Sequence, residues 1–111
     1  MTISGSCLCG AVSFTVEKLT GPFEICHCDR CRKTSSGLGA AMIGCQTNDF
    51  SFVNGADKIQ SFTAPLLHTP PAYHSDFCGT CGSSLPHVDM QSDVMGIPAG
   101  LIDGNIDIKP G

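Results

Sequence analysis

The chain has 111 residues, 41% of them hydrophobic but only 6% aromatic, and its formal net charge is −4. This length predicts a single domain, residues 1–111. Its hydrophobic core is small, so it needs cross-links for additional stability. The acidic balance argues against nucleic-acid binding, because such proteins usually carry a basic surface. The sequence has neither a leader pattern nor an apolar run near the about 18 residues of a membrane span. We therefore expect a cytoplasmic protein without a membrane partner.

Short apolar or alternating runs, separated by many of the 13 glycines and 7 prolines, favour strands over long helices. The expected strands are residues 11–16, 39–43, 50–53, 59–62, 73–77 and 94–97. Asn54-Gly55 is typical of a hairpin turn between two of them. Residues 69–71 (Thr-Pro-Pro) indicate a loop, and one helical turn is expected near 29–36. The prediction is a mainly β domain of short antiparallel sheets with one short helical turn.

Seven of the eight cysteines fall into three tight clusters, and these have the spacing of metal ligands. The clusters are Cys7-Leu8-Cys9, Cys26-His27-Cys28-Asp29-Arg30-Cys31 and Cys78-Gly79-Thr80-Cys81. Disulfides are disfavoured because cytoplasmic thiols stay reduced and because a bridge within such a close pair would close a strained ring. Thiolates grouped in this way are typical zinc ligands. Four thiolates and three thiolates predict two zinc ions.

The first and third clusters together supply the four thiolates of a closed structural site. On an extended strand Cys7 and Cys9 would point to one face. Cys78 and Cys81 belong to a Cys-x-x-Cys turn. Neither pair completes a zinc site alone, so we expect all four to bind one ion and to tie the N-terminal strand to a much later segment.

The middle cluster supplies only three thiolates, from Cys26, Cys28 and Cys31. Its fourth position is open to water, an added thiol or a distant residue. The candidates within the chain are Cys45, His68, His74 and His87. Cys45 is more typical of a small buried hydrophobic residue than of a ligand. His27 points away from the site and is expected to pack or hydrogen-bond nearby.

An open position on zinc is where chemistry occurs. Zinc holds an incoming thiol as the thiolate, which is the nucleophilic form. Three basic residues beside Cys31, namely Arg30, Arg32 and Lys33, could meet the carboxylates of an anionic thiol. The plainer interpretation of these three is a solvated surface. No catalytic residue beyond the zinc ligands follows from the residues, and four side chains remain open as proton-transfer groups: Asp29, His27, Tyr73 and His74.

Three motifs resemble those of the glutathione-dependent formaldehyde-activating enzymes and their relatives. They occur in order, and they are Gly5-Ser6-Cys7-Leu8-Cys9-Gly10-Ala11-Val12, Cys26-His27-Cys28-Asp29-Arg30-Cys31-Arg32-Lys33 and Phe77-Cys78-Gly79-Thr80-Cys81-Gly82-Ser83-Ser84-Leu85. The resemblance implies a zinc-binding β-tent fold. It implies a structural zinc on the outer two motifs and a second zinc on the middle motif.

The implied activity is the formation of S-hydroxymethylglutathione from glutathione and formaldehyde, formally a carbon–sulfur lyase reaction in reverse. The expected partners are therefore glutathione, or a related small thiol, and an aldehyde. The alternative is a non-catalytic, zinc-stapled module that binds a protein. A fourth protein ligand on the middle zinc would favour this alternative, whereas an open position would favour the enzyme.

Overall fold

The computed structural model describes residues 2–64 and 73–104, and the expected loop at 69–71 lies outside them. Three antiparallel sheets, each of three strands, form the described part of the chain. The first is built from β1 (Ile3–Ser6), β2 (Ser13–Val16) and β5 (Phe50–Asn54); the second from β3 (Leu19–Cys26), β4 (Ala40–Gln46) and β9 (Val94–Pro98); the third from β6 (Ile59–Ala64), β7 (Tyr73–Cys78) and β8 (Ser84–Leu85).

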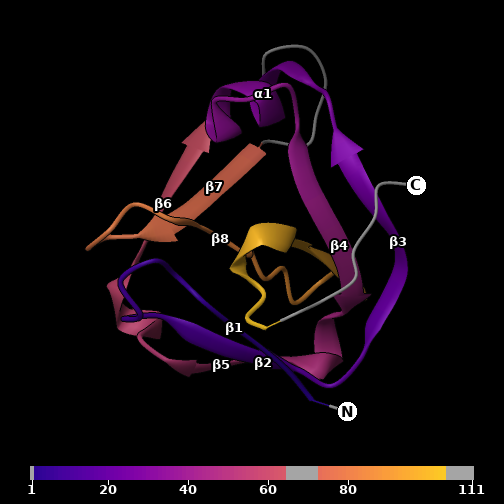
Figure 1. The fold of residues 1–111 in the computed structure, drawn as a ribbon, viewed down its shortest axis with the longest axis vertical. Coiled ribbons are helices and arrows are strands. Elements are labelled where there is room, and N and C mark those ends of the chain that lie inside the picture. The colour runs from indigo at the N-terminus through magenta and orange to yellow at the C-terminus, as the bar shows by residue number, and fades with distance from the viewer. Residues whose placement is uncertain (1, 65–72, 105–111) are drawn as a thin grey trace.

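In Figure 1 the three sheets outline a triangle, with the helix α1 (Asp29–Ser35) at its apex between β3 and β4. Short 3-10 turns precede β5 and β6 and follow β9; they span Thr47–Asp49, Ala56–Lys58 and Ala99–Leu101. The fold is thus mainly β with short antiparallel sheets and one short α-helix, as predicted. No helix in residues 2–64 and 73–104 is long and apolar enough to cross a membrane.

The core lies between the sheets because the inward residues of their strands alternate with outward ones. Phe14 is buried on β2, and its ring lies 5.1 Å from that of Phe50 on β5. Phe52 meets Phe50 edge to face with the ring centres 4.9 Å apart. Ile97 on β9 and Cys45 on β4 are fully buried in the same cluster. Cys45 therefore packs as a small apolar residue, as predicted.

All six predicted strands are present, although some of their ends differ by one to three residues. The largest difference is the end of β4 at Gln46, three residues later than predicted, and β2 starts two residues later than predicted, at Ser13. Residues 11–12 are not in β2 because the Val12 N–H donates to the Cys7 sulfur at 3.3 Å. The helical turn predicted near 29–36 is α1. Three strands were not predicted, namely β1, β3 and β8.

The hairpin predicted at Asn54-Gly55 is wrong. β5 pairs with β2, and β6 pairs with β7, so the two strands that flank the turn belong to different sheets. Gly55 does adopt a positive φ of 80°, the feature on which the prediction depended. However, it caps the turn Ala56–Lys58, which redirects the chain into the third sheet. Long-range pairing of β5 with the buried β2 outweighs the local turn signal.

Candidate functional site: two groups of converging cysteines

The structure brings the sulfurs of Cys7, Cys9, Cys78 and Cys81 within 4.8 Å of one another. Cys7 and Cys9 lie in the turn after β1, and their sulfurs are 3.6 Å apart. The expectation that an extended strand aligns this pair is therefore wrong, since a turn closed by the Gly10 N–H on the Cys7 carbonyl does so. Cys78 ends β7, and its sulfur is 3.8 Å from that of Cys9.

Two similar turns shape this group. Each places a glycine with a φ of 81° directly after its second cysteine, Gly10 in one turn and Gly82 in the other. A side chain at either position would strain the backbone, so glycine fits the turn. Backbone amides then point at the sulfurs, as the Thr80 N–H does to Cys78 at 3.4 Å. Such donors stabilise thiolate charge.

Ser83 links the two turns. The Leu8 N–H donates to its hydroxyl oxygen at 3.0 Å, and the hydroxyl lies 3.2 Å from the Cys81 sulfur. This side-chain contact is the main reason that the pKa of Cys81 is lowered to about 5. The N-terminal turn and the 78–82 turn are therefore held together through sulfur and hydroxyl contacts, at a site where Cys7 and Cys78 are buried.

The second group lies where β3 meets α1. Cys26 is the last residue of β3, and Cys28 is the N-cap of α1 with an extended backbone. Cys31 is buried one turn into the helix. The Cys26 and Cys28 sulfurs are 3.6 Å apart, and all three sulfurs lie within 4.8 Å of one another. His27 lies between two of them, but its Nδ1–H donates to the Leu38 carbonyl at 3.0 Å, as expected for a residue outside the ligand set.

Cys28 and Cys31 differ in their tendency to ionise. The pKa of Cys28 is lowered to about 7, chiefly because the Cys31 N–H donates to its sulfur. Burial raises the pKa of Cys31 to about 12, and the neighbouring sulfurs add to this rise. Of these two thiols, the exposed Cys28 is therefore the one that ionises more readily.

Both groups fit a tetrahedral zinc ion. Zinc–sulfur bonds of about 2.3 Å in tetrahedral geometry place the sulfurs about 3.8 Å apart. The sulfur pairs at 3.6 and 3.8 Å match this spacing. All-thiolate donor sets favour zinc or iron–sulfur clusters over harder ions. No fourth histidine, cysteine, aspartate or glutamate completes the 26–31 group among the side chains that the structure describes, and His68 lies outside them.

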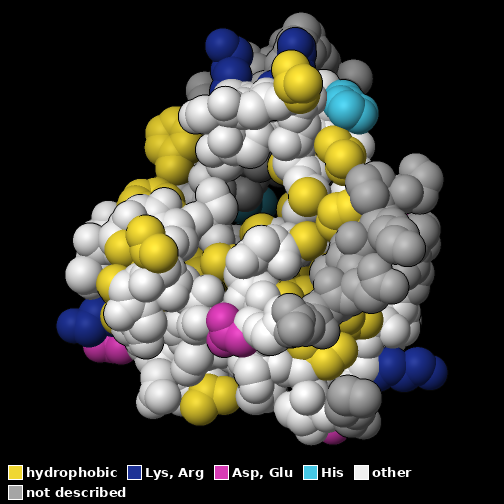
Figure 2. Space-filling model, in the orientation of Figure 1, with side chains coloured by type: hydrophobic (Ala, Val, Ile, Leu, Met, Phe, Trp, Pro, Cys, Tyr) yellow, Lys and Arg dark blue, Asp and Glu magenta, His cyan; other side chains and the backbone are white. Residues whose placement is uncertain are grey.

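A cavity of about 570 Å³ opens beside the second group. Figure 2 shows it as a hollow in the centre of this face of the molecule. Cys26 and Cys31 form part of its wall, together with residues of α1, β4, β7, β8 and the end of β9. Leu85 and Pro86 contribute buried apolar surface. The volume is within the range of pockets that hold a drug-sized ligand.

The three basic residues beside Cys31 lie on α1 and not in the described walls of the cavity. Arg32 and Lys33 are exposed in its last turn, whereas Arg30 is half-buried in its first. Figure 2 shows Lys and Arg side chains at the top of the molecule, where α1 lies in Figure 1. They can therefore act on a ligand only from the rim.

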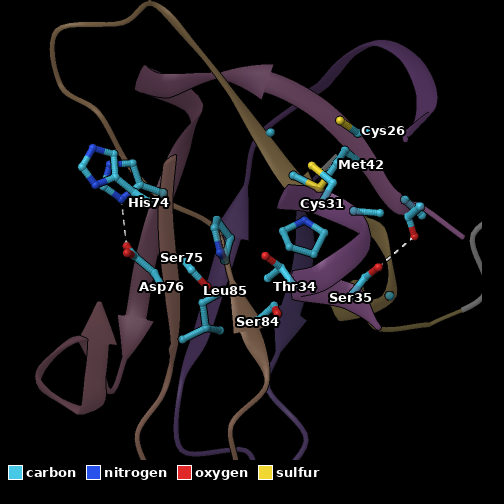
Figure 3. A pocket seen from close by; sticks show the side chains of 18 residues that line it. Cys26, Cys31, Thr34, Ser35, Met42, His74, Ser75, Asp76, Ser84 and Leu85 are labelled. Carbon is cyan, nitrogen blue, oxygen red and sulfur yellow. Dashed lines mark hydrogen bonds and ion pairs between the residues drawn. The ribbon is translucent and has the colours of Figure 1, made fainter. Parts of the chain in front are cut away.

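Two of the candidate histidines, His74 and His87, line the cavity together with Asp76. Figure 3 shows His74 and Asp76 on the opposite side of the cavity from Cys26 and Cys31. Asp76 did not emerge from the sequence. The available signal was its spacing from His74, because residues two apart on a strand share a face. His74 and His87 therefore lie away from the 26–31 sulfurs and do not complete their ligand set.

These features define a small β protein with two groups of cysteines that could hold a metal ion. One group has four thiols, and the other has three and lies at a cavity. The family model described as glutathione-dependent formaldehyde-activating enzyme matches residues 2–111. The chain belongs to this family.

A protein of Halomonas elongata that carries the provisional name of a glutathione-dependent formaldehyde-activating enzyme is 39% identical over 114 residues, which cover 99% of this chain and 71% of that protein. The crystal structure of a Rhodobacter sphaeroides protein has a TM-score of 0.71 at 24% identity, covering 94% of this chain and 91% of the other. The second likeness supports the fold alone.

Proposed function

We propose that this protein catalyses the addition of glutathione to formaldehyde in the cavity beside Cys26 and Cys31. In this reaction the thiol sulfur forms a bond to the carbonyl carbon, the π bond opens, and the thiol proton ends on the oxygen. The product is S-hydroxymethylglutathione, and the reaction is formally that of a carbon–sulfur lyase in reverse. The family to which the chain belongs supports both substrates.

The observation that carries the proposal is an incomplete ligand set at a cavity. Three sulfurs converge, two of them line the cavity, and the described side chains offer no fourth ligand. A closed structural site needs four ligands, whereas a catalytic site keeps one position for water or substrate. The non-catalytic module requires a protein ligand at that position, so this arrangement favours the enzyme.

The residues divide into a structural and a reactive set. Zinc on Cys7, Cys9, Cys78 and Cys81 would staple the N-terminal turn to β7. Zinc on Cys26, Cys28 and Cys31 would hold an incoming thiol in its nucleophilic form near neutral pH. The cavity walls hold the two reactants together, which reduces the entropic cost of a bimolecular step. Because thiolate ligands must stay reduced, we place the protein in the cytoplasm.

The basic residues of α1 supply the positive charge that attracts an anionic thiol. Arg32 and Lys33 lie one helical turn or less from Thr34 and Ser35, which line the cavity. From this rim, together with Arg30, they attract the carboxylates of glutathione. Their exposure makes each contact worth a modest amount, about 0.2–1 kcal/mol for an exposed ion pair.

Cobalt substitution tests the proposal. Glutathione added at millimolar concentration should change the sulfur-to-cobalt absorption of the loaded protein, and S-methylglutathione, which has no thiol, should not. Exchange spectroscopy by NMR then measures whether the zinc protein accelerates the interconversion of formaldehyde and S-hydroxymethylglutathione. An unchanged absorption spectrum together with an unchanged exchange rate would contradict the proposed function and favour the module.

A further inference from the structure

The cavity wall opposite the cysteines contains a histidine–aspartate pair. His87 follows β8 and Asp76 lies on β7, and both line the cavity that Cys26 and Cys31 share. Figure 3 shows Asp76 with its dashed interaction on the side away from the two cysteines. A ligand that touches both ends must therefore extend across the cavity.

Two neighbours, Ser61 and His74, contact this pair directly. The His87 Nδ1 is 3.0 Å from Asp76 Oδ2, and the Ser61 hydroxyl donates to Asp76 Oδ1 at 2.8 Å. The His74 ring stacks on His87 with centres 4.5 Å apart and planes inclined by 15°. His74 is itself held by Thr63, whose Oγ1 lies 3.1 Å from its Nδ1. Because the carboxylate accepts the Nδ1–H, Nε2 carries the lone pair in the neutral form of the His87 ring.

This wall carries an acidic side chain. Among the described residues that line the cavity, Asp76 is the sole carboxylate, and none is lysine or arginine. Its side chain is 12% exposed and that of His87 is 38% exposed. A carboxylate in so little water attracts a cation more strongly than one at the open surface. The Nε2 lone pair of His87 adds a hydrogen-bond acceptor.

We propose that Asp76 and His87 form a subsite for the primary ammonium group of the thiol substrate. This inference rests on the proposed function, and it identifies which end of the thiol enters the cavity. In extended glutathione eight bonds separate the sulfur from the γ-glutamyl ammonium, a reach of about 10 Å. With the sulfur at the cysteines, a chain of this length extends the ammonium toward the wall that carries Asp76. The basic residues of α1 would then act on the glycyl carboxylate, because the γ-glutamyl carboxylate shares its carbon with the ammonium.

The test compares glutathione with its deamino analogue, in which glutaryl replaces the γ-glutamyl group. Dissociation constants come from cobalt absorption titrations of the wild type, Asp76→Asn and the control Asp57→Asn, which removes an exposed carboxylate. We expect the wild type and the control to bind glutathione about tenfold more tightly than the analogue, since charged hydrogen bonds are the strong ones. Asp76→Asn should raise the dissociation constant of glutathione about tenfold and leave that of the analogue unchanged.

His87 gives a second comparison. His87→Gln keeps an acceptor oxygen and should retain most of the preference, whereas His87→Leu should abolish it. Equal binding of both ligands by the wild type would overturn the subsite without any variant. An equal loss of both ligands in Asp76→Asn would also overturn it, because that pattern indicates a general effect on the cavity.

NMR separates this inference from the thiol chemistry. S-methylglutathione has the ammonium but no thiol, so its binding does not depend on the cysteines. It should shift the ring signals of His87, and its deamino counterpart should not. Shifts without any cobalt response to glutathione would support the subsite and contradict the thiol site. Identical shifts with both S-methyl ligands would overturn the subsite alone.

Discussion

The same substitution at two cysteines, Cys78→Ser and Cys28→Ser, should have very different effects on folding. Cys78 is 1% exposed and belongs to a group that joins the first turn of the chain to the end of β7. Cys28 is exposed and belongs to a group that spans only six consecutive residues. The chemical change is identical, so the difference reports what each group stabilises.

Cys78→Ser should remove nearly the whole free energy of unfolding of the chain. At about 0.05–0.15 kcal/mol per residue, 111 residues correspond to about 6–17 kcal/mol. Structural zinc contributes about 10–16 kcal/mol in zinc-finger peptides. An unfolded chain holds the Cys7–Cys9 and Cys78–Cys81 pairs far apart, so this binding stabilises the folded state alone. Losing one of the four thiolates should abolish cooperative folding at 25 °C.

The expected cost at Cys28 is small for two reasons. The three cysteines of this group are close in sequence, so the unfolded chain also binds zinc there, and little differential stabilisation results. In addition, the Cys28 sulfur caps α1 by accepting the Cys31 N–H, and serine is a good N-cap residue. We expect a loss of at most about 1 kcal/mol, or a fall in Tm of about 4–8 °C.

Circular dichroism melts and zinc content measure both outcomes. Cys28→Ser should melt cooperatively with one zinc per chain, whereas Cys78→Ser should show no cooperative transition. Equal melting temperatures for the two variants would refute the division into a structural and a reactive group. A cooperative Cys78→Ser that still holds two zinc ions would refute the assignment of its four ligands.

Three further predictions follow from other parts of the structure. Gly55→Ala should lower the free energy of unfolding by more than the about 1–2 kcal/mol that a left-handed backbone costs a residue with a side chain, because the added Cβ overlaps a carbonyl oxygen between β1 and β2. Gly104 also has a positive φ, 88°, but has open space around it. Gly104→Ala should therefore lose only the about 1–2 kcal/mol, and urea unfolding measures both variants. The Cys45 thiol, whose pKa is raised chiefly by burial, should resist iodoacetamide at pH 8 until the chain unfolds, and mass spectrometry of the native protein would contradict this if it found Cys45 alkylated. Replacing Arg32 and Lys33 with alanine should raise the KM for glutathione about 2–30-fold with little change in kcat, and an unchanged KM would remove these residues from substrate binding.

The strands could be predicted wherever one face of a segment is apolar and its ends carry turn residues. β3 was missed because Gly21 and Pro22 interrupt its apolar run, and its pairing with β4 shifts register between Thr20 and Phe23. The hairpin at Gly55 was wrong for the opposite reason. Its local signal is clear, but β5 places Phe52 opposite Phe14 of β2, and that burial is decided by residues far away in the sequence.

The cysteine pairs and the triplet could be predicted because ligand spacing is a local property of the chain, and the joining of Cys7 and Cys9 with Cys78 and Cys81 followed from the four ligands that a closed zinc site needs. The cavity could not, since its wall combines the end of β3 with β7, β8 and the end of β9, which come from two different sheets. Asp76 illustrates the limit. Its neighbours along the chain are ordinary strand residues, and only the folded structure places it near His87 and across from Cys31.

The two cysteine groups explain how so small a chain can hold a cavity. A small domain buries a lower fraction of its surface than a large one, so links between the three sheets add to the stability that packing supplies. The group at Cys7 and Cys78 ties the first sheet to the third, and the contact of β4 with α1 holds the second group over the space between. That space need not be filled with side chains, because metal bound by these groups would replace the packing that would otherwise close it. A binding cavity is then a consequence of the staple, and the three-thiol group lies in its wall.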